Sequence, residues 1–280
     1  MNINITVYHK DYLIFDSLIT AWRKTIQAIL RNKWLIWVNF KKDFFSQYKQ
    51  SGLGMLWSMI LPIMPVSAYL FLGYLRVLDV RGSIPFPVYI ISGMTFWLLL
   101  KDGIISGMRA IQQDKNILTK IDMPLIVVIL SRYGSVCANT LIRLAFLIFI
   151  LFFYNVVPNL NIILIPFVVL PLVCFGFGLG ILLGIFNSAN NDIGNVSNMF
   201  LTYGMFASSV IFPMPTEGIL GLVNSLNIFN HFIVGIRDFI VLGQFQYPAL
   251  FGASSAIGLC IMLLGVKWQH TVQYKVKNLL

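Results

Sequence analysis

The stretch KKDFFSQYKQSGLGMLWSMILPIMP, residues 41–65, decides the fold. Its first half is charged and aromatic with helical periodicity, and its second half is almost wholly apolar. Only a short segment with Ser51, Gly52 and Gly54 separates the two halves. A membrane surface suits the first composition and hydrocarbon suits the second. The stretch therefore predicts a helix on a membrane surface that leads, through a bend at the glycines, into a membrane-spanning helix.

The composition of the whole chain agrees with this interpretation. Of its 280 residues, 58% are hydrophobic and 11% are charged, whereas soluble globular proteins carry about 25% charged residues. The apolar segments leave no room for a soluble domain. The sequence thus predicts an all-α polytopic membrane protein with short loops.

The distribution of positive charge argues against a nucleic-acid partner. The net charge is +10, and eight of the 20 Lys and Arg residues precede residue 50, while five lie between Lys101 and Arg132. Basic residues gathered beside hydrophobic spans are typical of cytoplasmic loops. We therefore expect both termini in the cytoplasm, membrane lipids as neighbours and no nucleic acid. The three cysteines stand singly without a histidine nearby, so no metal site is expected.

Hydrophobic segments predict six transmembrane helices, with re-entrant helices between the fifth and the sixth. A cytoplasmic region, residues 1–53, precedes the spans and contains amphipathic helices with aromatic residues on one face and lysines on the other. A basic cytoplasmic tail, residues 269–280, follows the six-span domain of residues 54–268. The spans are expected at 54–76, 85–107, 125–157, 162–186, 196–212 and 248–268, and the re-entrant segment at 216–247.

Two features within the spans carry separate expectations. Arg143 lies inside the third span, where it either faces the bundle interior or a cavity, or extends to the cytoplasmic headgroups. Gly176, Gly180 and Gly184 are spaced as small-x-x-x-small pairs, which predicts close helix contact. The basic loop at residues 108–123 fits either a solvated loop or a surface for a partner.

The chain lacks residues for chemistry of its own. No GxxxxGK[ST] phosphate loop is present, so ATP binding by that route is excluded. No paired carboxylates, histidine cluster or activated nucleophile falls within the spans, as a membrane hydrolase or transferase would need. The sequence predicts a conduit whose energy comes from another protein.

Five motifs in order resemble the ABC-2 type transporter permeases of the polysaccharide-export branch, which moves O-antigen, capsule polymers or teichoic acids. The first motif matches at Lys42, Asp43, Phe44, Tyr48, Lys49, Ser51, Gly54, Trp57 and Pro62. The others are KNILTKIDMP (115–124), NNDIGN (190–195), SSVIFP (208–213) and NIFNHFIVGIRDFIVLG (227–243). Four of the five depart from the family pattern. The first has Lys42 and Gln47 where the family usually has Arg, and the second has Met123, Pro124 and Leu125 where it usually has Phe-Pro-Arg. Asn191 replaces the Arg before Asp-Ile, and SSVIFP lacks the first proline of the family's Ser-Pro-Val-x-x-Pro.

The resemblance implies a homodimer of six-span subunits in the bacterial inner membrane, joined to two copies of a cytoplasmic ABC ATPase. ATP and Mg would bind that partner, and this chain would be a transport subunit, not an enzyme, with no cofactor of its own. The implied ATPase-coupling residues are Lys41, Lys42, Asp43, Tyr48, Lys115, Asn116 and Lys120. Ser51, Gly54, Trp57 and Pro62 would shape the start of the channel-forming helix.

The implied substrate is undecaprenyl-diphosphate-linked polysaccharide, foremost O-antigen. Arg76, Arg81, Arg143 and Arg237 are the candidates for the channel and for the lipid diphosphate. One alternative is an ABC-2 permease that exports a drug or a small lipid. An alternative of another class is a membrane-embedded glycosyltransferase or acyltransferase.

Overall fold

The computed structural model describes residues 17–49, 51–57, 84–114, 123–156, 163–215 and 217–279, the side chains up to residue 273, and four single positions (60, 67, 71 and 118). The predicted first span, residues 54–76, lies largely outside this part of the chain. Within it, four helices are long and apolar enough to cross a membrane, and a bent helix pair is a fifth candidate. The four are α4 (Phe86–Gln113), α6 (Leu125–Phe153), α7 (Ile165–Asn187) and α11 (Pro248–Leu279). The all-helical membrane fold is confirmed, and the count of six spans stays a prediction.

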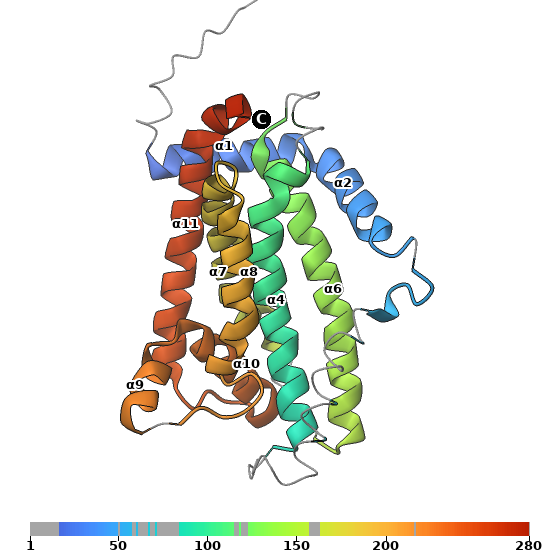
Figure 1. Ribbon diagram of the computed structural model, residues 1–280, viewed down its shortest axis with the longest axis vertical. Helices are drawn as coiled ribbons and strands as arrows, with labels where there is room; N and C mark the ends of the chain where they lie inside the picture. The colour runs from blue at the N-terminus through green and yellow to red at the C-terminus, as the bar shows by residue number, and fades with distance from the viewer. Residues whose placement is uncertain are drawn as a thin grey trace, which may run out of the picture.

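The four long helices stand side by side, and α1 (Leu18–Arg31) lies across one end of them (Figure 1). The hydroxyl of Ser17 caps α1 by accepting a hydrogen bond from the backbone N–H of Thr20 (3.2 Å). Ile19, Ile26 and Leu30 are exposed on α1, as expected of a helix whose apolar side meets lipid. The last turns of α11 lie at the same end as α1 (Figure 1).

Helix α2 (Lys33–Ser46) descends beside α6 (Figure 1). Phe40, Phe44 and Tyr48 form a continuous aromatic stripe, with ring centroids 5.8 Å and 5.6 Å apart. A Cβ atom at Gly134 of α6 would lie 3.2 Å from the ring of Phe40, so this stripe faces α6. Trp34 and Phe45 are exposed. Aromatic residues thus occupy two sides of α2 instead of the single face expected, because one stripe packs on α6.

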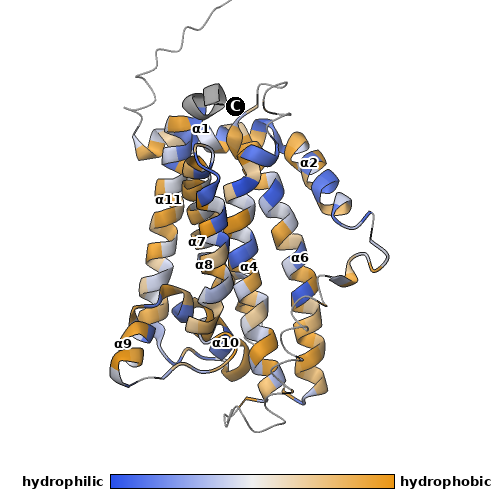
Figure 2. Cartoon of the chain, viewed as in Figure 1, coloured by the Kyte–Doolittle hydropathy of each residue, from blue (hydrophilic) through white to orange (hydrophobic). Residues whose placement is uncertain are grey.

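Helices α4 and α7 approach each other at glycines, as the small-residue spacing predicted. A Cβ atom at Gly180 would lie 3.0 Å from the carbonyl oxygen of Ile104, and one at Gly184 would lie 3.1 Å from that of Gly107. Such contacts let two helix backbones meet closely in lipid. Hydrophilic residues nevertheless interrupt α4 and α6 midway along their length (Figure 2).

The segment after α7 turns back from the end where α1 lies. Helix α8 (Asp192–Gly204) begins inside the predicted polar loop and has 13 residues, which at 1.5 Å each is about 20 Å. This is shorter than a hydrocarbon core of about 30 Å. A 3₁₀ turn, η2 (Met205–Ala207), and an irregular segment that reaches residue 215 follow it.

Helices α9 (Gly218–Leu226) and α10 (Ile228–Leu242) meet at an angle of 83°. Both lie at the end of the bundle away from α1 (Figure 1), which fits the re-entrant pair expected from the sequence. The side chain of Asn227 makes the bend, because its oxygen accepts from the N–H groups of Phe229 (3.0 Å) and Asn230 (3.3 Å). Gly243, with φ of +74°, then ends α10.

Candidate functional site

A polar cleft of about 430 Å³ opens between α2, α4 and α6. Charged side chains from all three helices line the cleft. Asp43 comes from α2, Asp102 and Arg109 come from α4, and Arg132 and Arg143 come from α6. Three cations against two carboxylates give the cleft a positive balance.

Arg143 occupies the deepest charged position of α6, ten residues before the helix ends at Phe153. Its Nη2 atom pairs with Oδ2 of Asp102 at 2.9 Å, and the side chain is 3% exposed. Its Nε and Nη1 atoms find no hydrogen-bond partner among the described residues. Of the two sequence interpretations, the structure thus bears out the one in which Arg143 faces a cavity.

A second ion pair lies nearer to the end where α1 lies. Arg132 donates from Nε to Asp114 Oδ2 (2.5 Å) and from Nη1 to Gln113 Oε1 (2.6 Å). Asp43 of α2 is close enough for its charge to respond to this pair. Burial raises the pKa of Asp43 above its ordinary value, and the positive charge of Arg132 partly opposes that rise.

The end of α2 is tied directly to α6. Tyr48 donates its hydroxyl to Asn139 Oδ1 (2.6 Å), and Asn139 donates from Nδ2 to Gln47 Oε1 (3.2 Å). Turns follow, in which Gly54 adopts a φ of +50°, a conformation that favours glycine. Trp57 returns to line the cleft.

The predicted coupling residues divide into three groups. Lys41 and Lys42 are exposed on α2, where Lys41 lies 5.1 Å from the ring of Trp37. Asp43 and Tyr48 line the cleft. The remaining residues that the resemblance singled out lie outside the described residues; these are Lys115, Asn116 and Lys120, together with Pro62, Arg76 and Arg81.

Arg237 lies in α10, away from the cleft, and its guanidinium is used within the chain. Its Nη2 donates to the carbonyl oxygens of Ser209 (2.8 Å) and Val210 (3.3 Å), and its Nε donates to Ser92 Oγ (3.3 Å). The side chain is 1% exposed and stacks 3.6 Å above the ring centre of Tyr89. These bonds satisfy the irregular backbone after η2, which hydrocarbon would leave without partners. The substrate role that the resemblance implies for Arg237 stays a prediction.

Sequence reasoning missed Asp102, Arg109 and Arg132 as members of the site. A signal for Asp102 was available, because a carboxylate inside a span is a functional candidate by default. The contact between Asp102 and Arg143 could not be predicted from the sequence, because 41 positions separate the two residues. Among the described residues, no group of three or more His, Cys, Asp or Glu side chains is placed to hold a metal ion.

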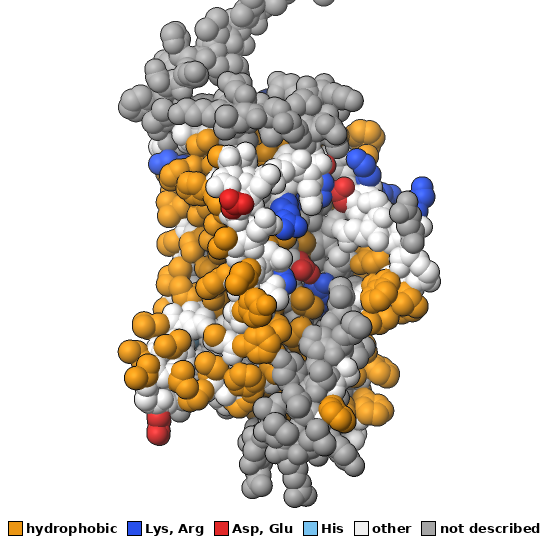
Figure 3. Space-filling model, in the orientation of Figure 1, with side chains coloured by type: hydrophobic (Ala, Val, Ile, Leu, Met, Phe, Trp, Pro, Cys, Tyr) orange, Lys and Arg blue, Asp and Glu red, His pale blue; other side chains and the backbone are white. Residues whose placement is uncertain are grey.

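One face of α8 is uncovered. Val196, Met199, Phe200 and Tyr203 recur at helical spacing and are each 63–67% exposed. On another side of α8, Thr202 accepts a hydrogen bond from the Lys101 ammonium of α4 (2.9 Å). Figure 3 shows charged side chains among hydrophobic ones midway along this face of the molecule. Charged side chains in the middle of membrane-spanning helices usually face water or protein, not lipid. Those on this face therefore indicate a water-accessible path.

Comparison with known proteins gives one family and two groups of relatives. The family model described as ABC-2 type transporter matches residues 35–241, well over half of the chain. The chain is 26% identical over 191 residues to the O-antigen export system permease protein RfbA of Myxococcus xanthus, covering 67% of this chain and 72% of that protein. It is 22% identical over 250 residues to the protein of the same name from Klebsiella pneumoniae, covering 88% of this chain and 95% of that one.

Proposed function

The chain belongs to the ABC-2 type transporter family, and from this premise we propose that it is the permease subunit of an ABC exporter that moves lipid-linked polysaccharide, foremost O-antigen, across the inner membrane. The similarity to O-antigen export permeases extends over 88% of the chain. It therefore includes the helices that bound the cleft and the uncovered face of α8.

One observation carries the polysaccharide assignment. The ammonium of Lys101 on α4 bonds Thr202 of α8, and the next residue, Tyr203, is exposed together with Phe200. Aromatic rings stack on the apolar faces of sugar rings, and polar groups hydrogen-bond the hydroxyls between them. A path with both kinds of side chain suits a sugar chain better than it suits a purely apolar drug or lipid.

A second copy of the chain would enclose this path. The apolar stripe of α8 is too regular to be a scatter of single exposed residues, and a two-fold partner would present the same stripe in return. We therefore propose a homodimer whose two α8 helices border the channel. Two copies of a cytoplasmic ABC ATPase complete the exporter, with α1, α2 and both chain ends on the ATPase side.

We propose the charged cleft as the place where the lipid diphosphate binds. Within the described part of the chain, the Nε and Nη1 atoms of Arg143 find no acceptor, and Arg109 lies in the same cleft. Guanidinium groups bind phosphate oxygens through short charge-assisted hydrogen bonds. A diphosphate there would sit between α2, which the ATPase would move, and α4 and α6, which form the other walls of the cleft.

The test uses inside-out membrane vesicles from the native host, which contain the chain, its ATPase and lipid-linked polymer. With ATP and Mg, polymer is expected to move into the lumen, where an added glycosidase cannot degrade it. A hydrolysis-deficient ATPase variant is the control and should leave all polymer degradable. If polymer stays degradable with the active complex while a dye or small lipid is transported, the drug or lipid exporter is the correct assignment. Glycosyl transfer by the chain alone would favour the membrane transferase instead.

A further inference from the structure

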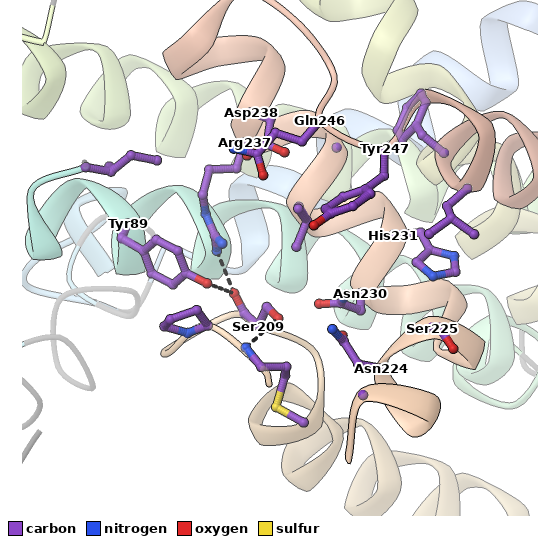
Figure 4. Close-up of a pocket in the computed structure, with 18 residues that line it drawn as sticks. Tyr89, Ser209, Asn224, Ser225, Asn230, His231, Arg237, Asp238, Gln246 and Tyr247 are labelled. Atoms are coloured by element: carbon purple, nitrogen blue, oxygen red, sulfur yellow. Dashed lines mark hydrogen bonds between the residues drawn. The ribbon is translucent and has the colours of Figure 1, made fainter. Parts of the chain in front are cut away.

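A second cavity, of about 460 Å³, lies at the end of the bundle away from α1. Residues of α9, α10, the start of α4, the segment after η2 and the beginning of α11 enclose it (Figure 4). Its volume falls in the range of about 300–1,000 Å³ that is common for small-molecule sites. The cavity is separate from the charged cleft, with which it shares no lining residue.

The wall of this cavity is rigidly built around Ser209. This residue has a φ of +47°, a conformation that costs free energy for any residue other than glycine. Its carbonyl oxygen accepts from Arg237 Nη2 (2.8 Å) and from the hydroxyl of Tyr89 (3.0 Å), and its own hydroxyl accepts from the N–H of Met214 (3.2 Å). Three bonds thus hold one strained residue in place (Figure 4), so the site is formed before any ligand arrives.

Three residues that line the cavity each have a buried oxygen atom without a donor. Asn224 Oδ1, Asn230 Oδ1 and Asp238 Oδ2 have no hydrogen-bond partner among the described residues. Asn230 is 6% exposed and Asp238 is 5% exposed. Buried acceptors without donors are unfavourable and rare in folded proteins. The cavity therefore suits a ligand that brings several donors at once.

The residues around these oxygen atoms indicate which hydrogen-bond donors a ligand would bring. Arg237, the residue before Asp238 in α10, already places a positive charge near enough to act on that carboxylate, so this charge would oppose a further cation. Neutral hydroxyl groups meet no such opposition. Tyr247 and Phe251 add aromatic surface to the lining, and a ring with hydroxyls on its edge and C–H groups on its faces fits both features.

We propose that this cavity binds one sugar unit of the exported polymer as the chain leaves the channel. The proposal rests on the proposed function, since only an exporter of polysaccharide would bring such a unit here. Asn224, Asn230 and Asp238 would accept the sugar hydroxyls, while Tyr247, at the rim and half exposed, would cover a ring face. The sugar of a glycolipid headgroup has the same chemistry, and the experiment separates the two sources.

The experiment places the photoreactive residue p-benzoylphenylalanine at one position at a time in the full exporter in living cells. Tyr247 samples the cavity and Tyr203 samples the uncovered face of α8. Leu259, exposed on α11 and outside the cavity lining, is the matched control. After irradiation, adducts are detected with an antibody against the polymer, and their mass separates long polymer from single lipids.

Polymer adducts are expected at residues 247 and 203, with at least tenfold less at residue 259. Asn224→Leu should lower the adduct at residue 247 at least fivefold and leave the adduct at residue 203 unchanged. Adducts at residue 203 alone would overturn the cavity proposal and leave the export function standing. A lipid-sized adduct at residue 247 would also overturn it. Absence of polymer adducts at both positions, with polymer retained inside the cell, would refute the export function itself.

Discussion

Arg143 and Arg237 are both buried arginines within the helical bundle, and their surroundings give them different tasks. The Arg237 guanidinium donates to Ser92 and to the carbonyl oxygens of Ser209 and Val210, which no helix satisfies. Among the residues that the structure describes, Arg143 pairs with one carboxylate, and its Nε and Nη1 atoms find no acceptor. Because a buried guanidinium needs partners, we expect Arg237 to stabilise the fold and propose Arg143 for binding a ligand.

Replacement of Arg143 separates its structural contribution from its transport role. Arg143→Ala should lower the free energy of unfolding by about 2 kcal/mol, a moderate loss because Asp102 is 35% exposed and partly hydrated. The double variant Arg143→Ala/Asp102→Asn should recover most of this stability, since no unpaired carboxylate remains, yet export should stay low. Thermal unfolding in detergent and polymer export in cells are the two measurements. Full export by the double variant would remove Arg143 from the diphosphate site.

Gly93 is required where Arg237 meets the irregular backbone. A Cβ atom there would collide with Arg237 Nη2 and with the carbonyl of Val210. Gly93→Ala should therefore destabilise the protein by about 1–3 kcal/mol. Gly252 of α11 has open space around it, so Gly252→Ala should be neutral or stabilising by up to about 1 kcal/mol. Equal unfolding temperatures for the two variants would contradict the packing described for Arg237.

At the scale of elements, α2 connects the membrane surface to the charged cleft. Its aromatic stripe packs on α6, and the hydrogen bond from Tyr48 to Asn139 fixes its end. A movement of α2 would therefore reach Asp43 and Arg132, which contribute to the same cleft. This places α2 where an ATPase movement could change the cleft.

The raised pKa of Asp43 predicts the direction of a pH effect on α2. A folded pKa above the unfolded one means that protonation stabilises the packed helix, and this contribution is lost as the pH rises through the folded pKa. Asp43→Asn keeps the neutral form at every pH. At pH 7 the backbone amides of α2 should exchange with deuterium no faster in the variant than in the wild type. Any difference in exchange rate between the two proteins should shrink at lower pH, where Asp43 of the wild type is also neutral. Faster exchange in the variant at pH 7 would show that the charged form of Asp43 stabilises α2.

The sequence predicts features that depend on a single helix better than features that depend on contacts between distant segments. The Gly180 and Gly184 spacing predicted the contact with α4 because small residues at every fourth position act locally on one helix face. The pairing of Arg143 with Asp102 and the cavity around Ser209 depend on contacts between segments far apart in the sequence, which periodicity does not encode. Helix α8 was placed too late because Asn and Asp residues at its start indicate a loop as readily as a helix N-terminus.

At the scale of the whole molecule, the described helices form one half of a proposed conduit. The apolar stripe of α8 remains uncovered in a single chain, and in the proposed dimer it would form part of the channel wall. Native mass spectrometry of the purified exporter should find two copies of this chain and two of the ATPase. A stable complex with one copy of the chain would contradict the enclosure of the channel by two α8 helices.

The central claim is that this chain carries lipid-linked polysaccharide out of the cytoplasm. The most direct measurement is the location of the polymer in spheroplasts of a strain that lacks the gene, with and without a plasmid copy. An antibody added outside should label the polymer only when the chain is present, and the deletion strain should hold its polymer inside. External labelling that persists in the deletion strain would contradict the claim.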